Sequence, residues 1–342
     1  MTDVETIGAA VDRFLAGERT LALTALVLKS SGDAQERLCR AACASRDAHF
    51  PARTVEVRSV LEVSNVCRQR CRYCSMWEAE GSPRYTLAGE AIAAIADGVY
   101  ARGRRVLMLQ SGENPSPAFV SHMAAAVSRV KAAHADLRLI LCLGSLSLEQ
   151  FRELRQAGAE RYILKFESSS PELYHSVKPS DTLGHRLAAM EAALESGFLL
   201  GSGSIVGLPQ QRLEDVAADL LCTTRWRLGM VSASVFVPGE RSGFAAEPPG
   251  DVNLTLNAMA ILRLLNPDCL IPSTSSLDRI EPGAQLRGLR AGANTVTIHD
   301  GTPDELKAAF PIYSSQRIMP REVYLRELVQ RAGLQWAEEA LK

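Results

Sequence analysis

The sequence predicts an α/β protein, a (β/α)8 TIM barrel with a helical N-terminal extension and a C-terminal helix. From residue 55 onward, strand-like and amphipathic helix-like segments alternate eight times, which favours parallel strands joined by helices. The strand-like segments are almost continuously apolar, as strands buried on both faces should be. Unusually polar residues follow several of them, at the end where such barrels carry their chemistry. An open, doubly wound sheet is the alternative.

The first part of the chain has only helical character. Apolar residues recur at helical spacing over 4–15, 20–29 and 33–48, and Pro51 ends this part. The expected units are therefore a helical extension over 1–52, the barrel over 53–318 and a C-terminal helix over 319–342, of which 320–342 is predicted to be helical.

The elements of the barrel follow in order from the periodicity of the sequence. The expected strands are 55–63, 105–110, 138–143, 161–166, 200–206, 230–237, 269–273 and 294–298. The expected helices are 87–102, 116–134, 147–157, 182–197, 212–226, 254–265 and 283–291. Gly158 and Gly197 stand where helices should end, and Ser147 stands where one should begin.

Composition excludes several classes of protein. The 342 residues are 46% hydrophobic and 23% charged, with a net charge of -1 and no long basic run, which argues against a nucleic-acid partner. Apolar stretches stop well short of a membrane span. The eight cysteines, without a secretory leader, do not resemble a disulfide framework. We therefore expect a reduced, cytoplasmic protein that binds neither nucleic acid nor membrane.

The strongest chemical signal is the spacing CxxxCxxC at Cys67, Cys71 and Cys74. The three cysteines follow the first expected strand, in a stretch made polar by three arginines, so they are not expected to be core residues. Thiolates are soft ligands that suit iron-sulfur clusters or zinc, which normally take four protein ligands. No fourth cysteine or histidine follows at ligand spacing. Three thiolates on a 4Fe-4S cube would leave one iron open to a small molecule.

The other five cysteines are interpreted as small apolar residues inside the fold. They are Cys39, Cys43, Cys142, Cys222 and Cys269.

Two further strand ends carry groups that could bind a ligand. The second strand ends in Gln110-Ser111-Gly112-Glu113, where the glycine lets the backbone approach a ligand and the glutamate offers an anion to an ammonium group. A plain turn is the alternative. The fourth strand ends at Lys165 and Glu167, and three serines follow. Arg186, at the start of the next long helix, could pair with a ligand carboxylate or with Glu167.

Two later strand ends are also polar. The glycine-rich run 201–207 in the fifth strand lacks the spacing and the acidic partner of a dinucleotide fingerprint, so NAD is not expected. The seventh strand ends in four hydroxyl residues, 273–276. Their hydroxyls could bind a carboxylate or phosphate, or could cap a helix.

These motifs together resemble those of radical S-adenosylmethionine (SAM) enzymes. The cysteine spacing, with Tyr73 before the last cysteine, resembles the signature that holds the cluster of these enzymes. Within the superfamily the motifs resemble those of HydE, the maturase of FeFe-hydrogenase; methylornithine synthase PylB and biotin synthase share fewer of them. The resemblance is collinear over about 55–315. The segments that carry it are 62–65, 110–113, 167 with 171–174, 203–209, 271–275, 292–294 and 312–313.

The resemblance implies a 4Fe-4S cluster on the three cysteines, with SAM on the open iron. The residues it implies for SAM are Tyr73, Gln110, Ser111, Gly112, Glu113, Glu167, Arg186, Ser204 and Ile205. Among them, Glu113 would meet the amino group of SAM and Glu167 the ribose hydroxyls. The residues it implies for the substrate are Arg58 near the cavity floor, Lys165, Thr274, Ser275 and Tyr313.

The implied activity is radical chemistry on a small, carboxylate-bearing, amino-acid-derived substrate inside the barrel, with electrons from a donor such as flavodoxin or ferredoxin. Lys165 stands where HydE tends to have arginine, and 236–244 lacks the pattern expected there. With Thr274 and Ser275, and with no carboxylate expected beside it, Lys165 would form an anion pocket. The alternatives are a PylB-like carbon-skeleton mutase and an iron-sulfur electron-transfer or sensor protein without SAM chemistry.

Overall fold

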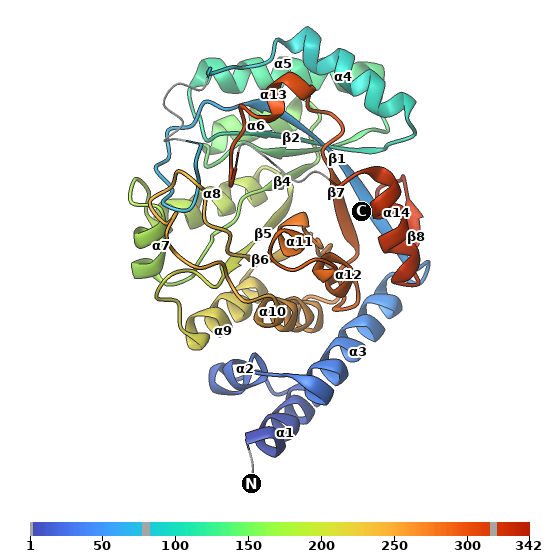
Figure 1. The fold of residues 1–342 in the computed structure, drawn as a ribbon. Coiled ribbons are helices and arrows are strands. Elements are labelled where there is room, and N and C mark those ends of the chain that lie inside the picture. Colours follow the sequence, from blue (N-terminus) through green and yellow to red (C-terminus); the bar gives the residue numbers. More distant parts are fainter. Residues whose placement is uncertain (1–2, 77–82, 315–319) are drawn as a thin grey trace.

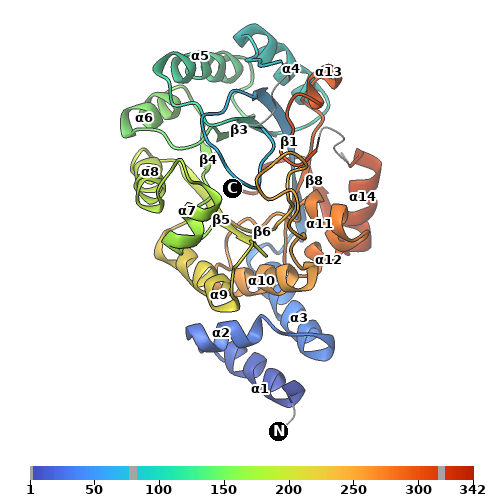
Figure 2. The same cartoon turned by 60° about the vertical axis from the view of Figure 1, so that its left-hand side comes forward.

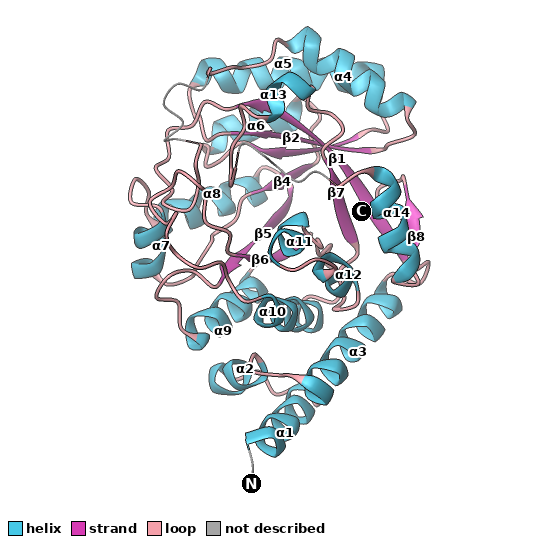
Figure 3. Ribbon diagram, in the orientation of Figure 1, coloured by secondary structure: helices cyan, strands magenta, loops and turns pink. Residues whose placement is uncertain are grey.

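The strands form a curled parallel sheet surrounded by helices. The computed structural model describes residues 3–76, 83–314 and 320–342. Seven parallel strands are hydrogen-bonded in the order β6-β5-β4-β3-β2-β1-β7, and Figure 3 shows them inside the helical layer. They are β1 (Thr54–Ser64), β2 (Val106–Ser111), β3 (Arg138–Cys142), β4 (Arg161–Ile163), β5 (Leu199–Val206), β6 (Met230–Val235) and β7 (Thr295–Ile298).

The seventh expected strand, 269–273, is present only as two isolated bridges. Met230 pairs with Leu270, and Pro272 pairs with Thr295. The amide of Val231 donates to Leu270 O at 3.0 Å, and proline cannot donate a second ladder bond. This segment therefore joins β6 to β7 without forming a regular strand, and the ring of the barrel closes through it.

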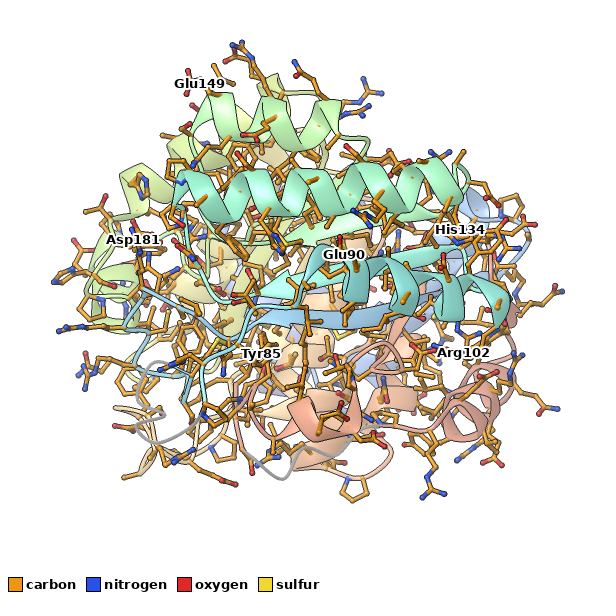
Figure 4. The ribbon with its side chains drawn as sticks, turned by 90° about the horizontal axis from the view of Figure 1, so that it is seen from above. Tyr85, Glu90, Arg102, His134, Glu149 and Asp181 are labelled. Carbon is orange, nitrogen blue, oxygen red and sulfur yellow. The ribbon has the colours of Figure 1, made fainter. Side chains whose placement is uncertain are left out.

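The helices cover the outer face of the sheet (Figure 2). The expected ones are α4 (Gly89–Ala101), α5 (Pro117–Ala133), α6 (Leu148–Gln156), α8 (Leu183–Glu195), α9 (Leu213–Cys222), α10 (Val252–Leu265) and α12 (Ala284–Leu289). Three short helices were not expected: α7 (Pro171–Val177), α11 (Ser275–Ile280) and α13 (Asp304–Lys307). Figure 4 views the outer layer, where Glu90, His134 and Glu149 are labelled on or beside α4, α5 and α6. No helix in the described part of the chain has the length and apolar character needed to cross a membrane.

Three N-terminal helices pack on one side of the barrel (Figure 1). They are α1 (Asp3–Leu15), α2 (Leu21–Val27) and α3 (Gly32–His49). Asn257 of α10 donates to Leu28 O at 2.9 Å and Ser30 O at 2.8 Å, and Arg46 of α3 donates to Leu289 O at 2.7 Å. The extension is thus bound to the barrel through buried polar contacts, away from the strand ends that carry the polar motifs.

The prediction of a helix over 320–342 is wrong after its first half. The helix α14 (Glu322–Arg331) ends before Gly333, which has φ +72°, a conformation that favours glycine at helix ends. The chain then forms β8 (Gln335–Ala337), which pairs in parallel with the start of β1. The expected boundary at 318 and 319 lies outside the described residues.

A buried ion cluster lies at the N-terminal end of the barrel. Glu56 has no exposed side-chain surface and accepts bonds from Arg58 at 2.8 Å and Arg161 at 2.9 Å, as well as from Leu341 N at 2.8 Å. Burial alone would raise the pKa of Glu56, but the two arginines outweigh it and hold that pKa below its usual value.

We expect Glu56→Ala to destabilise the fold, because it leaves two buried guanidinium groups without their carboxylate. Removing one partner of a buried ion pair costs about 3–5 kcal/mol. Urea unfolding of the cluster-free protein measures this loss. Glu90→Ala is the control, because Glu90 forms an exposed pair with Arg129 and should change stability by less than about 1 kcal/mol. Equal losses in both variants would contradict the role of the buried cluster.

Candidate functional site

A cavity opens at the carboxyl ends of the strands and has two chambers. The first chamber, about 310 Å³, lies against the loop after β1 and the ends of β2 to β6. The second chamber, about 210 Å³, lies between β6, β7 and α11. Gln110, Ser234, Ile312 and Tyr313 line both chambers, so the two are neighbours at one mouth of the barrel.

The three cysteines of the CxxxCxxC motif all line the first chamber. The amide of Glu113 donates to Cys67 Sγ, and the amide of Met76 donates to Cys74 Sγ, each at 3.4 Å. Burial raises the pKa of Cys71 to about 11 and also lifts those of Cys67 and Cys74. The sulfurs therefore need a nearby cationic centre to be held as thiolates. The two amides are placed to donate hydrogen bonds of the kind that tunes the reduction potential of an iron-sulfur cluster.

The arrangement fits a cluster better than a single ion. Among the described residues, no group of three or more histidine, cysteine, aspartate or glutamate side chains could hold one metal ion. A 4Fe-4S cube does not need so compact a group, because each thiolate binds a different iron.

Gly112 brings β2 against the cysteine loop. A Cβ at this position would lie 2.4 Å from Val66 O and 2.7 Å from Cys67 Cβ. The amide of Arg68 also donates to Glu113 O at 2.9 Å. Any side chain at position 112 would therefore push the first cysteine out of place.

We expect Gly112→Ala to lower the iron content after reconstitution, because the loop must move to admit the methyl group. Overpacking of this kind costs about 1–3 kcal/mol. Iron analysis and the charge-transfer absorbance of the cluster measure the effect. Gly89→Ala is the control, because its Cβ would meet only Ala126 Cβ at 3.9 Å. Full iron loading of Gly112→Ala would contradict this role.

Glu113 is bound to Arg186 in the first chamber. Arg186 donates to Glu113 Oε2 at 2.9 Å, Gln69 donates to Oε1 at 2.7 Å, and Lys178 lies 3.6 Å away. Burial would raise the pKa of Glu113, but Arg186 and Lys178 reverse that effect and keep it low. The predicted alternative in which Arg186 pairs with Glu167 is wrong, because α8 directs this buried guanidinium to Glu113 and Asp181.

Glu167 lies at the end of β4 with a backbone conformation unusual for its type. Its φ is +62°, in the left-handed region that few residues other than glycine adopt. Bonds to β5 hold it there: its amide donates to Gly203 O at 3.1 Å, and Ile205 N donates to its carbonyl at 2.9 Å. The side chain faces the first chamber, where Tyr73 Oη donates to it at 3.2 Å.

The three serines after Glu167 shape its turn and do not line either chamber. Ser168 and Ser169 donate to Asp219 Oδ1 through their hydroxyls, at 3.3 and 2.7 Å, and Ser170 caps α7. Burial raises the pKa of Asp219 to about 7. The hydroxyl run therefore fixes the strand end that presents Glu167.

The remaining residues predicted for SAM are placed as follows. Gln110, Ser111 and Ile205 line the first chamber, whereas Ser204 is buried and lines neither. Gly203, the neighbour of Ser204, lets the backbone of β5 lie close to that of β6, because a Cβ at position 203 would lie 2.0 Å from Ser232 O.

The predicted substrate residues do not meet in one pocket. Lys165 lines the first chamber, Thr274 and Ser275 line the second, and Tyr313 lines both. The expectation that no carboxylate lies beside Lys165 is wrong, because its Nζ is 3.0 Å from Glu167 Oε2. Arg58 belongs to the buried ion cluster with Glu56 and lines neither chamber.

Two residues of the second chamber were missed in the sequence. His299 follows β7 and lies 3.3 Å from the buried Glu62; its place after an expected strand was a usable signal. Arg279 lies on α11, a short helix that periodicity did not predict, so no pattern pointed to it.

A roof segment, residues 236–244, borders the first chamber through Phe236 and Val237. Gly239 N donates to Tyr73 O at 3.0 Å, Glu240 N to Tyr313 O at 2.8 Å, and Arg241 N to Ser75 Oγ at 3.2 Å. The roof thus joins the cysteine loop to the segment around residue 313.

Comparison with known proteins gives one consistent family. The model of the radical SAM superfamily matches residues 61–221. The chain is 33% identical over 262 residues to the [FeFe] hydrogenase maturase subunit HydE of Thermotoga maritima, covering 76% of this chain and 74% of that one. It is 27% identical over 268 residues to biotin synthase 2 of Frankia casuarinae, covering 77% and 74%.

Solved structures agree on the fold. The crystal structure of methylornithine synthase PylB matches with a TM-score of 0.80 and 24% identity, covering 96% of this chain and 97% of that one. The maturase HydG of Carboxydothermus hydrogenoformans matches with a TM-score of 0.82 and 18% identity, covering 98% and 80%. At these identities the likeness concerns the fold alone.

Proposed function

The chain belongs to the radical SAM superfamily, and on this premise we propose that it cleaves SAM in the first chamber to act on a small, carboxylate-bearing molecule, as a HydE-like enzyme. Enzymes of this superfamily use a 4Fe-4S cluster and SAM. We assign the cluster to Cys67, Cys71 and Cys74. When bound, the cluster supplies an electron that splits SAM into methionine and a 5'-deoxyadenosyl radical.

The observation that carries the proposal is the lining of the first chamber, where the three cysteines, Glu113 and Glu167 face the same space. Three thiolates would leave one iron of a 4Fe-4S cube open for SAM. Glu113, oriented by Arg186, has lone pairs left for the amino group of SAM. Glu167, held by its turn and by Tyr73, would accept the ribose hydroxyls, and the roof segment would keep water from a reactive radical.

An electron donor must reach the cluster from outside. Arg68, Arg70 and Arg72 are exposed on the cysteine loop, and none of them forms an ion pair with a carboxylate of the described residues. Exposed guanidinium groups favour an acidic partner, which supports a donor such as flavodoxin or ferredoxin.

Release of 5'-deoxyadenosine tests the proposal. We expect the reconstituted protein, given SAM and dithionite without oxygen, to form 5'-deoxyadenosine and methionine. No 5'-deoxyadenosine from a cluster-loaded protein would instead indicate an iron-sulfur electron-transfer or sensor protein. With substrate present, less than one 5'-deoxyadenosine per product would indicate a PylB-like mutase that regenerates SAM.

A further inference from the structure

The second chamber contains a cation that the sequence motifs did not identify. Arg279 lines it together with the hydroxyl residues Thr274, Ser275, Ser276 and Thr297. None of the described residues lining this chamber is aspartate or glutamate. The chamber therefore offers positive charge and hydroxyl groups to its occupant.

The lysine and arginine side chains that line the two chambers differ in how strongly they are already neutralised. Arg186 and Lys178 pair with the largely buried Glu113. Lys165 lies 3.0 Å from Glu167, and both side chains are largely buried, with 21% and 12% exposed. Arg279 lies 3.5 Å from Glu240, whose side chain is 56% exposed. A pair at this distance with a solvated carboxylate is weak, so Arg279 remains available to an incoming anion.

On the basis of the proposed function, we propose that Arg279 is the specificity-determining residue of the second chamber, where it binds the carboxylate of the substrate together with the hydroxyls of Thr274 and Ser275. The planar guanidinium matches a carboxylate through two parallel hydrogen bonds. Among the described residues that line this chamber, Arg279 is the only permanently charged cation, and His299 lies beside the buried Glu62. One guanidinium offsets one negative charge, which favours a carboxylate over a phosphate ester carrying almost two.

Glu240 then competes with the substrate for Arg279. It lies on the roof segment, which Glu240 N attaches to Tyr313 O at 2.8 Å. Removing the charge of Glu240 should therefore strengthen anion binding, whereas removing the charge of Arg279 should weaken it. A purely structural role for the pair would not produce opposite effects.

Succinate is a suitable probe, with its neutral amide succinamide as the matched control. We expect the cluster-loaded protein with SAM to bind succinate and not succinamide in calorimetry. Arg279→Met should weaken succinate binding about ten- to a hundredfold. Arg279→Lys should recover part of the affinity, because lysine restores the positive charge but not the two parallel hydrogen bonds of the guanidinium. Glu240→Gln should tighten binding by about two- to fivefold.

Arg287→Met is the matched control variant, because Arg287 also pairs with a glutamate, Glu281, but lies outside both chambers. Its succinate affinity should stay within about twofold of the unchanged protein. Absence of succinate binding, equal binding of succinamide, or unchanged affinity in Arg279→Met would overturn the inference. Tighter binding of inorganic phosphate than of succinate would overturn the choice of a carboxylate. Formation of 5'-deoxyadenosine by the unchanged protein tests the proposed function separately.

Discussion

Cys71→Ala should abolish both cluster assembly and SAM cleavage. Anaerobic reconstitution of the unchanged protein should give roughly four irons and four sulfides per chain, as expected for one cube on three thiolates. Cys71 is buried, with 9% of its surface exposed, whereas Cys67 and Cys74 are partly exposed. Losing it leaves two thiolates of the assigned set. Cys142 lines the same chamber, but it lies at the end of β3, outside the cysteine loop. Iron analysis, absorbance and 5'-deoxyadenosine release measure the loss.

Cys222→Ala is the control, because Cys222 ends α9 and lines neither chamber. It should retain the iron content and activity of the unchanged protein. Retention of a cube by Cys71→Ala would contradict the ligand assignment, and roughly eight irons in the unchanged protein would indicate a second cluster.

Glu167→Ala should leave the cluster spectrum intact but weaken SAM binding about ten- to a hundredfold, the effect of losing charge-assisted hydrogen bonds of roughly 1.5–3 kcal/mol. The side chain lies in the first chamber, held by Tyr73 and by the backbone pairing of Glu167 with Ser204 of β5. Equilibrium binding of SAM to the oxidised, cluster-loaded protein measures the change.

Glu172→Ala serves as the control for this variant, because Glu172 lies on the neighbouring helix α7 and is exposed. Unchanged SAM affinity in Glu167→Ala would show that the residue is not at the ribose. Loss of the cluster as well would show that its role is to hold the loop of Tyr73.

The architecture could be predicted because its signals are local. Mostly apolar runs mark β1 to β6, although Glu56, Arg58 and Glu62 interrupt the run of β1. The cysteine spacing marks the loop that follows β1. The irregular form of the segment around Pro272, which was expected as a regular strand, and the strand β8 could not be predicted in the same way. Each depends on pairing with a distant strand, β7 in one case and β1 in the other, and such pairing leaves no periodic signal in a segment of three to five residues.

In the functional site, too, local sequence signals predicted some residues, whereas contacts between distant residues were not predicted. The motif at 110–113 and Glu167 were found because they follow strands. Their partners were not. Arg186 reaches Glu113 only because α8 packs beside the end of β2. Lys165, only two residues from Glu167, was assigned to the substrate instead of to Glu167. The serines after Glu167 were noted only as a polar run at the strand end. Two of them, Ser168 and Ser169, bind Asp219 of α9, and sequence spacing cannot reveal that partner.

The central claim is that SAM binds directly to the open iron of a cube held by Cys67, Cys71 and Cys74. Electron-nuclear double resonance on the reduced protein tests it, using SAM labelled with ¹⁷O in the carboxylate and ¹⁵N in the amino group. We predict hyperfine coupling of both labels to the cluster. A reduced cluster whose spectrum is unchanged by labelled SAM, at concentrations that saturate binding, would contradict the account.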